Sequence, residues 1–321
     1  MFHFFRKERA KVVYSSDYIY GLPTAGDHQT FDLMKYKKIK DQLVKEKILK
    51  RYNIIRPDLC PYEDLKLVHT EAYLKSLQDP LNVSNLLRLT DVDLFYNSIL
   101  EYYRAVTGGT LLATAYALKW NVPTFNLGGG YHHAHPDKAE GFCLINDVAI
   151  AIQKFRNLHR VQRFMIIDLD YHQGNGNLLF FKDDPDVYTF SMHADCWVEI
   201  ERDHNKDILL SSGIKDDEYM KILKRELSNA CQFFNPEAVF YIAGSDPYEK
   251  DALADMKISR KGMLERNLYV FAKVRKHKIP LIILAGGGYG KHSWEIYYDF
   301  ISYCLKNNVS SIKINDDEFY Y

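Results

Sequence analysis

Short apolar runs alternate with longer amphipathic segments over most of the chain. After residue 120, apolar runs bounded by turn residues predict buried strands at 122–127, 164–169, 187–192, 238–243 and 281–285. Apolar residues at helical spacing between them predict helices at 148–158, 216–234, 260–277 and 292–305. This alternation favours an α/β fold with a mainly parallel central sheet and helices on both of its faces.

The N-terminal part of the chain is more helical. Its predicted elements are a strand at 11–14 and helices at 31–52, 70–77 and 93–120. Thr70 is a suitable N-cap for the short helix that follows it. The Gly108-Gly109 pair inside the long helix indicates either a bend or a close packing contact. The segments 78–93 and 313–321 have no regular pattern.

No tract rich in Pro, Gly or Ser divides the chain, and it contains no internal repeat. We therefore expect one domain over 1–321, with its motif-bearing core at about 11–305. The 42 basic and 42 acidic residues cancel, so bulk charge gives no indication of a nucleic-acid partner.

The cysteines and the composition of the N-terminus indicate the cellular compartment in which the protein is expected. The five cysteines are odd in number and widely spaced, unlike a disulfide framework or a cysteine-based zinc site. The charged N-terminus does not resemble a signal peptide, and no apolar stretch approaches the ~18–20 residues that span a membrane. We expect a soluble intracellular protein, cytoplasmic or nuclear, and the pattern gives no oligomeric state.

The strand predicted at 164–169 ends in polar residues at alternate positions, namely Asp168, Asp170 and His172. Because alternation is the strand period, these side chains start out on the same face. Ligands bind at the carboxyl ends of strands in open α/β sheets, and Asp and His are ligands of zinc-type ions. Alone, this stretch fits a metal site and a strand exit with solvated acids equally well.

Four predicted strands end in unusual loops, at 128–135, 168–176, 244–251 and 286–290. Parallel strands bring their carboxyl ends to one edge of a sheet, so these loops can converge. The triple glycines of the first and last loops lack the lysine, hydroxyl and spacing of a phosphate-binding loop. Close approach of the backbone to a ligand and a plain structural turn both explain them.

The pair His132-His133 follows a predicted strand and three glycines. A neutral imidazole is the usual general base near pH 7, so these residues are candidates for that role. Tyr289, in the last loop, offers a hydroxyl donor. The structural alternatives are an ordinary surface loop for the histidines and one more tyrosine among 24 for Tyr289.

Asp246 follows the strand predicted at 238–243. It could be a turn acid before a proline, which is a favoured turn pair. It is also the natural third ligand, since Asp170, His172 and Asp246 would leave one coordination position open, as catalytic zinc requires.

Five motifs occur in order along the chain. They are Gly-Gly-Gly-Tyr-His132-His133-Ala, Gly141-Phe142-Cys143-Leu-Ile-Asn-Asp147, Asp168-Leu-Asp170-Tyr-His172-Gln-Gly-Asn-Gly, Ala-Gly-Ser-Asp246-Pro and Gly-Gly-Gly-Tyr289. This set resembles the zinc-dependent histone deacetylase family, within the arginase–deacetylase fold. The similarity runs from Lys11 to about Leu305. The Gln-Gly-Asn-Gly variant and the segment Thr107-Gly-Gly-Thr110 are most similar to the class IV branch and its bacterial relatives.

The resemblance implies a zinc-dependent amidohydrolase that removes acyl groups from lysine side chains. The implied zinc ligands are Asp170, His172 and Asp246. The implied catalytic residues are His132, His133, Asp168, Asn175 and Tyr289. The implied substrate-binding residues are Gly141, Phe142 and Gly288. A structural potassium ion near Asp168, Asp170 and Ser191 is also implied.

Asn175 departs from the pattern of many family members, which carry a carboxylate paired with the second histidine. An amide cannot stabilise an imidazolium by charge. It therefore either lowers the pKa of His133 and favours the neutral base, or only orients the ring. The class IV branch shares this asparagine, so the resemblance still implies activity.

Two other classes of function are less consistent with the sequence. A ureohydrolase such as arginase uses two manganese ions and further carboxylates, where this chain has Gly174 and Tyr248. A non-catalytic acyl-lysine-binding module has no need of the catalytic positions, all of which are filled here. Among substrates, the class IV resemblance favours long-chain fatty-acyl lysine, and small acylated amines such as acetylpolyamines are the alternative.

Overall fold

The computed structural model of the chain describes residues 10–19, 32, 34–79, 81–83, 96–200 and 203–307. The tail at 313–321 lies outside the described residues, as do most of the segment 78–93 and the predicted start of the long helix.

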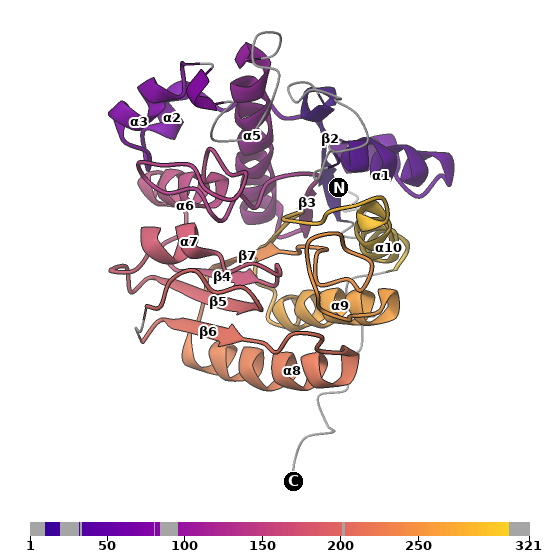
Figure 1. The fold of residues 1–321 in the computed structure, drawn as a ribbon. Helices are drawn as coiled ribbons and strands as arrows, with labels where there is room; N and C mark the ends of the chain where they lie inside the picture. Colours follow the sequence, from indigo (N-terminus) through magenta and orange to yellow (C-terminus); the bar gives the residue numbers. More distant parts are fainter. Residues whose placement is uncertain are drawn as a thin grey trace, which may run out of the picture.

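The described strands form one parallel sheet of eight, in the order β2-β1-β3-β8-β7-β4-β5-β6 (Figure 1). Their bounds are β1 Lys11–Val13, β2 Ile54–Ile55, β3 Thr124–Asn126, β4 Phe164–Asp168, β5 Val187–His193, β6 Asn205–Leu209, β7 Ala238–Ile242 and β8 Leu281–Leu284. All neighbouring strands are parallel. The predicted α/β class with a parallel sheet is confirmed.

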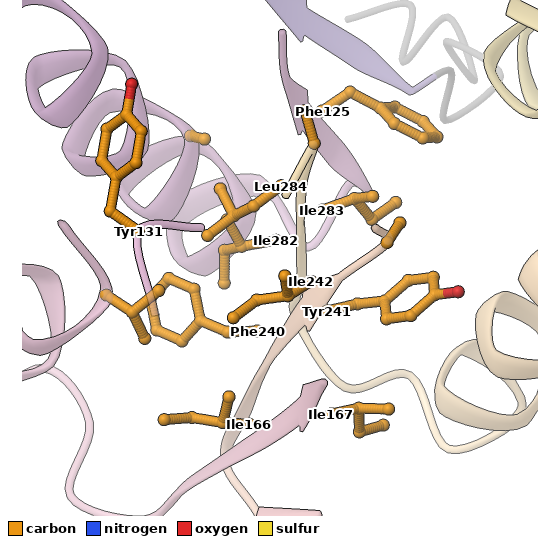
Figure 2. Close-up of a cluster of buried hydrophobic side chains, with 14 of the residues drawn as sticks. Phe125, Tyr131, Ile166, Ile167, Phe240, Tyr241, Ile242, Ile282, Ile283 and Leu284 are labelled. Atoms are coloured by element: carbon orange, nitrogen blue, oxygen red, sulfur yellow. The ribbon is translucent and has the colours of Figure 1, made fainter. Parts of the chain in front are cut away.

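The central strands are buried on both faces of the sheet and are apolar apart from Asp168 at the end of β4. In β4, β7 and β8 every residue is buried. Ile166 pairs with Phe240, and Ile167 pairs with Tyr241. Figure 2 shows these two pairs pointing to opposite sides of the sheet. Strands of this kind have continuous hydrophobic runs, which made them predictable.

Helices lie on both sides of the sheet (Figure 1). The longer ones are α1 Met34–Lys45, α5 Tyr96–Trp120, α6 Asp147–Asn157, α8 Asp216–Phe233, α9 Arg260–Lys276 and α10 Ser293–Lys306. The shorter ones are α2 Tyr62–Leu65, α3 Glu71–Ser76, α7 Asn175–Phe180 and the 3-10 helices η1 Ser16–Ile19 and η2 Arg51–Asn53. Helix α5 packs against α6, β3 and β8, whereas α1, α10, α9 and α8 pack in succession. Within the described part of the chain, no helix has the length and apolar character to cross a bilayer.

The helix predicted over 31–52 was too long at its C-terminal end. It ends at Lys45, because Lys47 adopts a φ of 58° and the N–H groups of Ile48 and Leu49 bond back to the carbonyl of Leu43. The 3-10 helix η2 and then β2 follow this turn. The prediction also missed β6 and α7, since β6 has only half-buried and exposed positions and α7 is six residues long.

Helix α5 continues through its glycine pair, so close packing explains these residues. A Cβ on Gly108 would lie 2.0 Å from the carbonyl oxygen of Asp58. A Cβ on Gly109 would lie 1.8 Å from the hydroxyl of Tyr18. The two glycines therefore let α5 approach the preceding segments closely.

A buried arginine fixes the exits of two central strands. Arg266 of α9 has no exposed surface. Its guanidinium donates to the carbonyl of Leu169 at 2.9 Å and to that of Gly244 at 2.8 Å. These carbonyls follow β4 and β7, immediately before the loops that carry Asp170 and Asp246.

Arg266→Met is expected to lower the free energy of unfolding by about 3 kcal/mol, because two buried carbonyls lose their charged donor. Urea denaturation followed by circular dichroism measures the loss. Arg260→Met on the same helix is the control, since its ion pairs with Glu295 and Asp299 are partly exposed and should contribute less than about 1 kcal/mol. Equal losses in the two variants would contradict this role.

Candidate metal centre and active site

Three potential metal ligands meet at the carboxyl ends of β4 and β7. Asp170 and His172 come from the loop after β4, and Asp246 from the loop after β7. Each offers one ligand atom, and these three atoms lie within 4.8 Å of one another. Nδ1 of His172 is 3.2 Å from a carboxylate oxygen of each aspartate. Both aspartates are buried, so a cation between them would be shielded from solvent.

Backbone groups from neighbouring loops hold both carboxylates in place. The N–H of Gly287, in the loop after β8, donates to Asp170 at 2.7 Å. The N–H of Tyr171 donates to Asp246 at 3.0 Å. Because β8, β7 and β4 are adjacent in the sheet, three loops converge on one group of ligands.

The electrostatics of this group fit a bound cation. Burial and the neighbouring charge of Asp170 raise the pKa of Asp246 to about 8. Burial alone would lower the pKa of His172, but its hydrogen bonds to Asp170 and Asp246 raise that pKa to about 11. Two buried acids thus favour a positive charge between them, which a divalent ion would supply.

The two candidate histidines lie beside this group, with their rings 4.1 Å apart between centroids. His132 Nδ1 is 2.7 Å from the carboxylate of Asp168, and His132 Nε2 is 3.9 Å from that of Asp170. His133 Nδ1 is 2.7 Å from the side-chain oxygen of Asn175. Each histidine therefore contacts one of the polar residues that the resemblance implied to be catalytic.

Burial and charge place the two imidazoles in different states. Burial would lower the pKa of His132, but Asp168 and Asp170 raise it to about 9. Burial and the charge of His132 hold the pKa of His133 well below its ordinary value. Without a metal, the carboxylates of Asp168 and Asp170 thus favour the cationic form of His132, and burial favours the neutral form of His133.

A buried aspartate shapes the glycine loop that leads to the histidines. Asn146 caps α6, because its side-chain oxygen accepts from the N–H of Ala149. Asp147 instead accepts from the N–H groups of Gly130 and Tyr131, at 3.1 and 2.9 Å. The loop after β3 is thereby tied to the start of α6.

Tyr289 is almost fully buried, and its ring centroid lies 6.0 Å from that of His172. Burial and the charges of Asp170 and Asp246 raise the pKa of the Tyr289 hydroxyl well above its usual value, so it remains a proton donor at neutral pH. The peptide bond before Tyr289 is held at both ends. Lys35 donates to the carbonyl of Gly288 at 3.1 Å, and the N–H of Tyr289 donates to Asp251 at 2.6 Å.

Burial lowers the pKa of Lys35 to about 8, against the raising effect of Asp246 and Asp251. Below about pH 8 both the folded and unfolded states carry the charge, and folding pays to bury it. This cost disappears as the pH rises from about 8 to about 10.5, because only the unfolded state stays protonated. Lys35→Met also loses the donor to the Gly288 carbonyl, at every pH. Its stability relative to wild type should therefore be higher at pH 7 than at pH 10, by roughly 2–3 kcal/mol.

Urea unfolding of both proteins at pH 7 and pH 10 measures this difference. Lys45→Met, at an exposed position of the same helix, is the matched control and should show no such trend. If the difference in free energy of unfolding between Lys35→Met and wild type does not change with pH, burial of the Lys35 ammonium is not costly to folding.

Of the three predicted substrate-binding residues, Gly141 lies against His133. A Cβ on Gly141 would lie 2.2 Å from the His133 ring, so only glycine fits there. Phe142 has a φ of 61° and is 38% exposed. Its carbonyl accepts from the hydroxyl of Tyr103, which holds this strained turn. Gly288 turns its carbonyl towards Lys35, as described above.

One residue of the site was missed from the sequence. Trp197 stacks on His133 with ring centroids 4.2 Å apart and an interplanar angle of 11°, and it is 38% exposed. The side chain of Gln173 accepts from the N–H groups of Trp197 and Val198, which fixes this loop after β5. The available signal was a tryptophan shortly after a predicted strand exit.

The chain is similar in sequence to a known protein family and to individual proteins. The family described as "Histone deacetylase domain" matches residues 29–301. Histone deacetylase 2 of Arabidopsis thaliana is 32% identical over 310 residues, covering 91% of this chain and 78% of that protein. An uncharacterized protein of a Picosynechococcus strain is 31% identical, covering 89% of this chain and 94% of that protein.

A crystal structure of an HDAC homolog complexed with SAHA matches the fold with a TM-score of 0.76. The match covers 94% of this chain and 89% of that chain, at 24% sequence identity. At this identity the match supports the architecture alone.

Proposed function

The chain belongs to the histone deacetylase family, which makes it a hydrolase, and we propose that it removes acyl groups from lysine side chains with the help of one zinc ion. The observation that carries this proposal is the buried group of Asp170, His172 and Asp246 beside two buried histidines. Two oxygens and one nitrogen from the protein leave a coordination position open, as in catalytic zinc sites. A bound zinc ion supplies Lewis acidity, which polarises a carbonyl oxygen and makes water more acidic.

The side chains around this ion have distinct roles in the proposal. Neutral His133 removes a proton from the water that attacks the acyl carbon. When the C–N bond breaks, the same imidazole returns that proton to the amine, so free lysine and a carboxylic acid leave. Cationic His132, held by Asp168, stabilises negative charge that develops on the substrate.

The hydroxyl of Tyr289 donates to the substrate oxygen in this proposal. Tyr289→Phe is expected to lower kcat by about 10²–10³-fold, because one donor to the developing oxyanion is lost. Zinc content should not change, since the phenol is not one of the three ligands. Steady-state kinetics and elemental analysis of the variant test this, and unchanged kcat would remove Tyr289 from the mechanism.

Two partly exposed aromatic residues, Phe142 and Trp197, support binding of an extended side chain. Phe142 directly follows Gly141 in the chain, and the ring of Trp197 stacks on that of His133. Aromatic faces suit the methylene chain of an acylated lysine, which carries no charge near its acyl end.

We also propose a structural potassium ion near Asp168, Asp170 and Ser191. Support comes from the register of the sheet, in which Asp168 at the end of β4 pairs with Ser191 of β5. This arrangement brings a carboxylate and a hydroxyl together beside the metal centre, and oxygen ligands suit a hard cation.

Turnover of a panel of acetyl-, octanoyl- and myristoyl-lysine peptides, together with an acetylpolyamine, tests the function and the substrate class. We propose fatty-acyl lysine as the preferred substrate, on the class IV resemblance and the amide at Asn175. A higher kcat/KM for the acetyl peptide would overturn that preference, and one for the polyamine would favour a small-amine deacylase. Binding without turnover would indicate an acyl-lysine-binding module, and two manganese ions per chain would indicate a ureohydrolase.

A further inference from the structure

A carboxylate lies directly behind the asparagine that contacts His133. Oε2 of Glu140 is 2.7 Å from the amide nitrogen of Asn175. The same oxygen is 2.8 Å from Nε2 of His135. Many family members have a carboxylate next to the second histidine, where this chain has Asn175. Here the carboxylate of Glu140 contacts Asn175 instead, on the side away from His133.

Three donors keep Glu140 in its ionised form. Its partial burial opposes ionisation, but His135, Asn175 and Lys138 lower the pKa of the carboxyl below its usual value. An ionised carboxylate accepts hydrogen bonds and cannot donate them. The group of Asn175 that faces Glu140 must therefore be the NH₂.

The orientation of the Asn175 amide in turn determines the tautomer of His133. With its NH₂ directed at Glu140, the amide presents its carbonyl oxygen to Nδ1 of His133, at 2.7 Å. A carbonyl only accepts, so Nδ1 of neutral His133 must carry the proton. Nε2 is then left with its lone pair, which is the form that can accept a proton from water.

We propose that Glu140 is a positioning residue, whose carboxylate fixes the orientation of the Asn175 amide and thereby the Nδ1–H tautomer of His133. The inference rests on the proposed function for its effect on rate, but the tautomer itself is a property of the protein without substrate. The backbone of Glu140 also pairs with that of Cys143, which would be kept in any side-chain variant of Glu140.

Glu140→Gln removes the constraint while keeping the shape. A glutamine can offer either its oxygen or its NH₂ to Asn175, so the amide can turn over and stabilise the Nε2–H tautomer of His133. We expect kcat to fall about 10–100-fold, as for other partners that orient a catalytic imidazole, with KM little changed. Lys182→Met is the control, because Lys182 is exposed and pairs with Asp183 outside this group of residues, and it should leave kcat unchanged.

A double variant separates positioning from simple disruption. Asn175→Asp alone brings two carboxylates together and should also lower kcat. Combining it with Glu140→Gln exchanges the acid and the amide, so that the aspartate accepts from His133 and the glutamine donates to the aspartate. We expect kcat of the double variant to be at least tenfold higher than that of Glu140→Gln. A double variant no faster than either single variant would overturn the proposal.

Nitrogen-15 spectra of the zinc-loaded protein without substrate test the tautomer directly. In wild type we expect a protonated Nδ1 and an unprotonated Nε2 for His133, and in Glu140→Gln a mixture or a reversal. An Nε2–H tautomer in wild type, or an unchanged tautomer in Glu140→Gln, would overturn the proposal. Because this measurement needs no turnover, it tests the tautomer of His133 even if the protein does not hydrolyse acyl-lysine.

Discussion

Asp246→Asn is expected to lose zinc and to hydrolyse no acyl-lysine peptide at a detectable rate. The substitution keeps the shape of the side chain and an oxygen for the N–H of Tyr171, but it removes one of the two charges that balance a divalent ion. Folding should survive, because Asp246 and Asp170 repel each other when the metal is absent. Zinc per chain after dialysis, peptide hydrolysis and thermal unfolding of the metal-free proteins measure the three effects.

Asp255→Asn serves as the control for this variant. Asp255 follows the same strand and is exposed, and its carboxylate accepts from the hydroxyls of Ser212 and Tyr171, not from any of the three ligands. An asparagine keeps an acceptor for these hydroxyls. It should retain zinc and activity. Zinc retained in full by Asp246→Asn would show that Asp246 is not a ligand, and activity at the wild-type level would refute the proposed centre.

His133→Ala is expected to lower kcat by about 10²–10⁴-fold, the usual contribution of a positioned general base. Its pKa is held well below the ordinary value, so the wild-type imidazole is free to accept a proton at neutral pH. Zinc should remain bound, since His133 is not among the three ligands. His277→Ala, at the exposed end of α9, is the control and should behave as wild type.

Single-turnover kinetics of His133→Ala measure the rate of the chemical step, and elemental analysis measures its zinc content. A loss of less than about tenfold with zinc retained would assign the proton transfer to another group, and His132 would then be the first candidate. Loss of zinc in this variant would instead indicate that the imidazole supports the metal site.

The sheet and the candidate site were predictable from the sequence to different extents. Strands buried on both faces are marked by continuous apolar runs, and the chemistry follows directly after them, as at Asp168 and Asp246. Elements at the edge gave weaker patterns. The C-terminal end of α1 depended on the left-handed conformation of Lys47, which no periodicity of apolar residues reveals.

Residues that act on others across long sequence separations could not be predicted. Glu140 and Asn175 are 35 positions apart, and only folding brings them into contact. Arg266 lies 97 positions from the carbonyl of Leu169. Trp197 stacks on a histidine from a different loop. Each of these has an ordinary local sequence, so its role depends on the tertiary structure alone.

The strand order has a consequence for the synthesis of this chain. β8 lies between β3 and β7 and is the only link between the β2-β1-β3 and β7-β4-β5-β6 groups of described strands. It is also the last of them in sequence. Until it is made, a nascent chain carries two sheet fragments with unpaired apolar edges, which favour aggregation. We therefore expect newly made chains to need protection by chaperones until residue 284 is available for pairing.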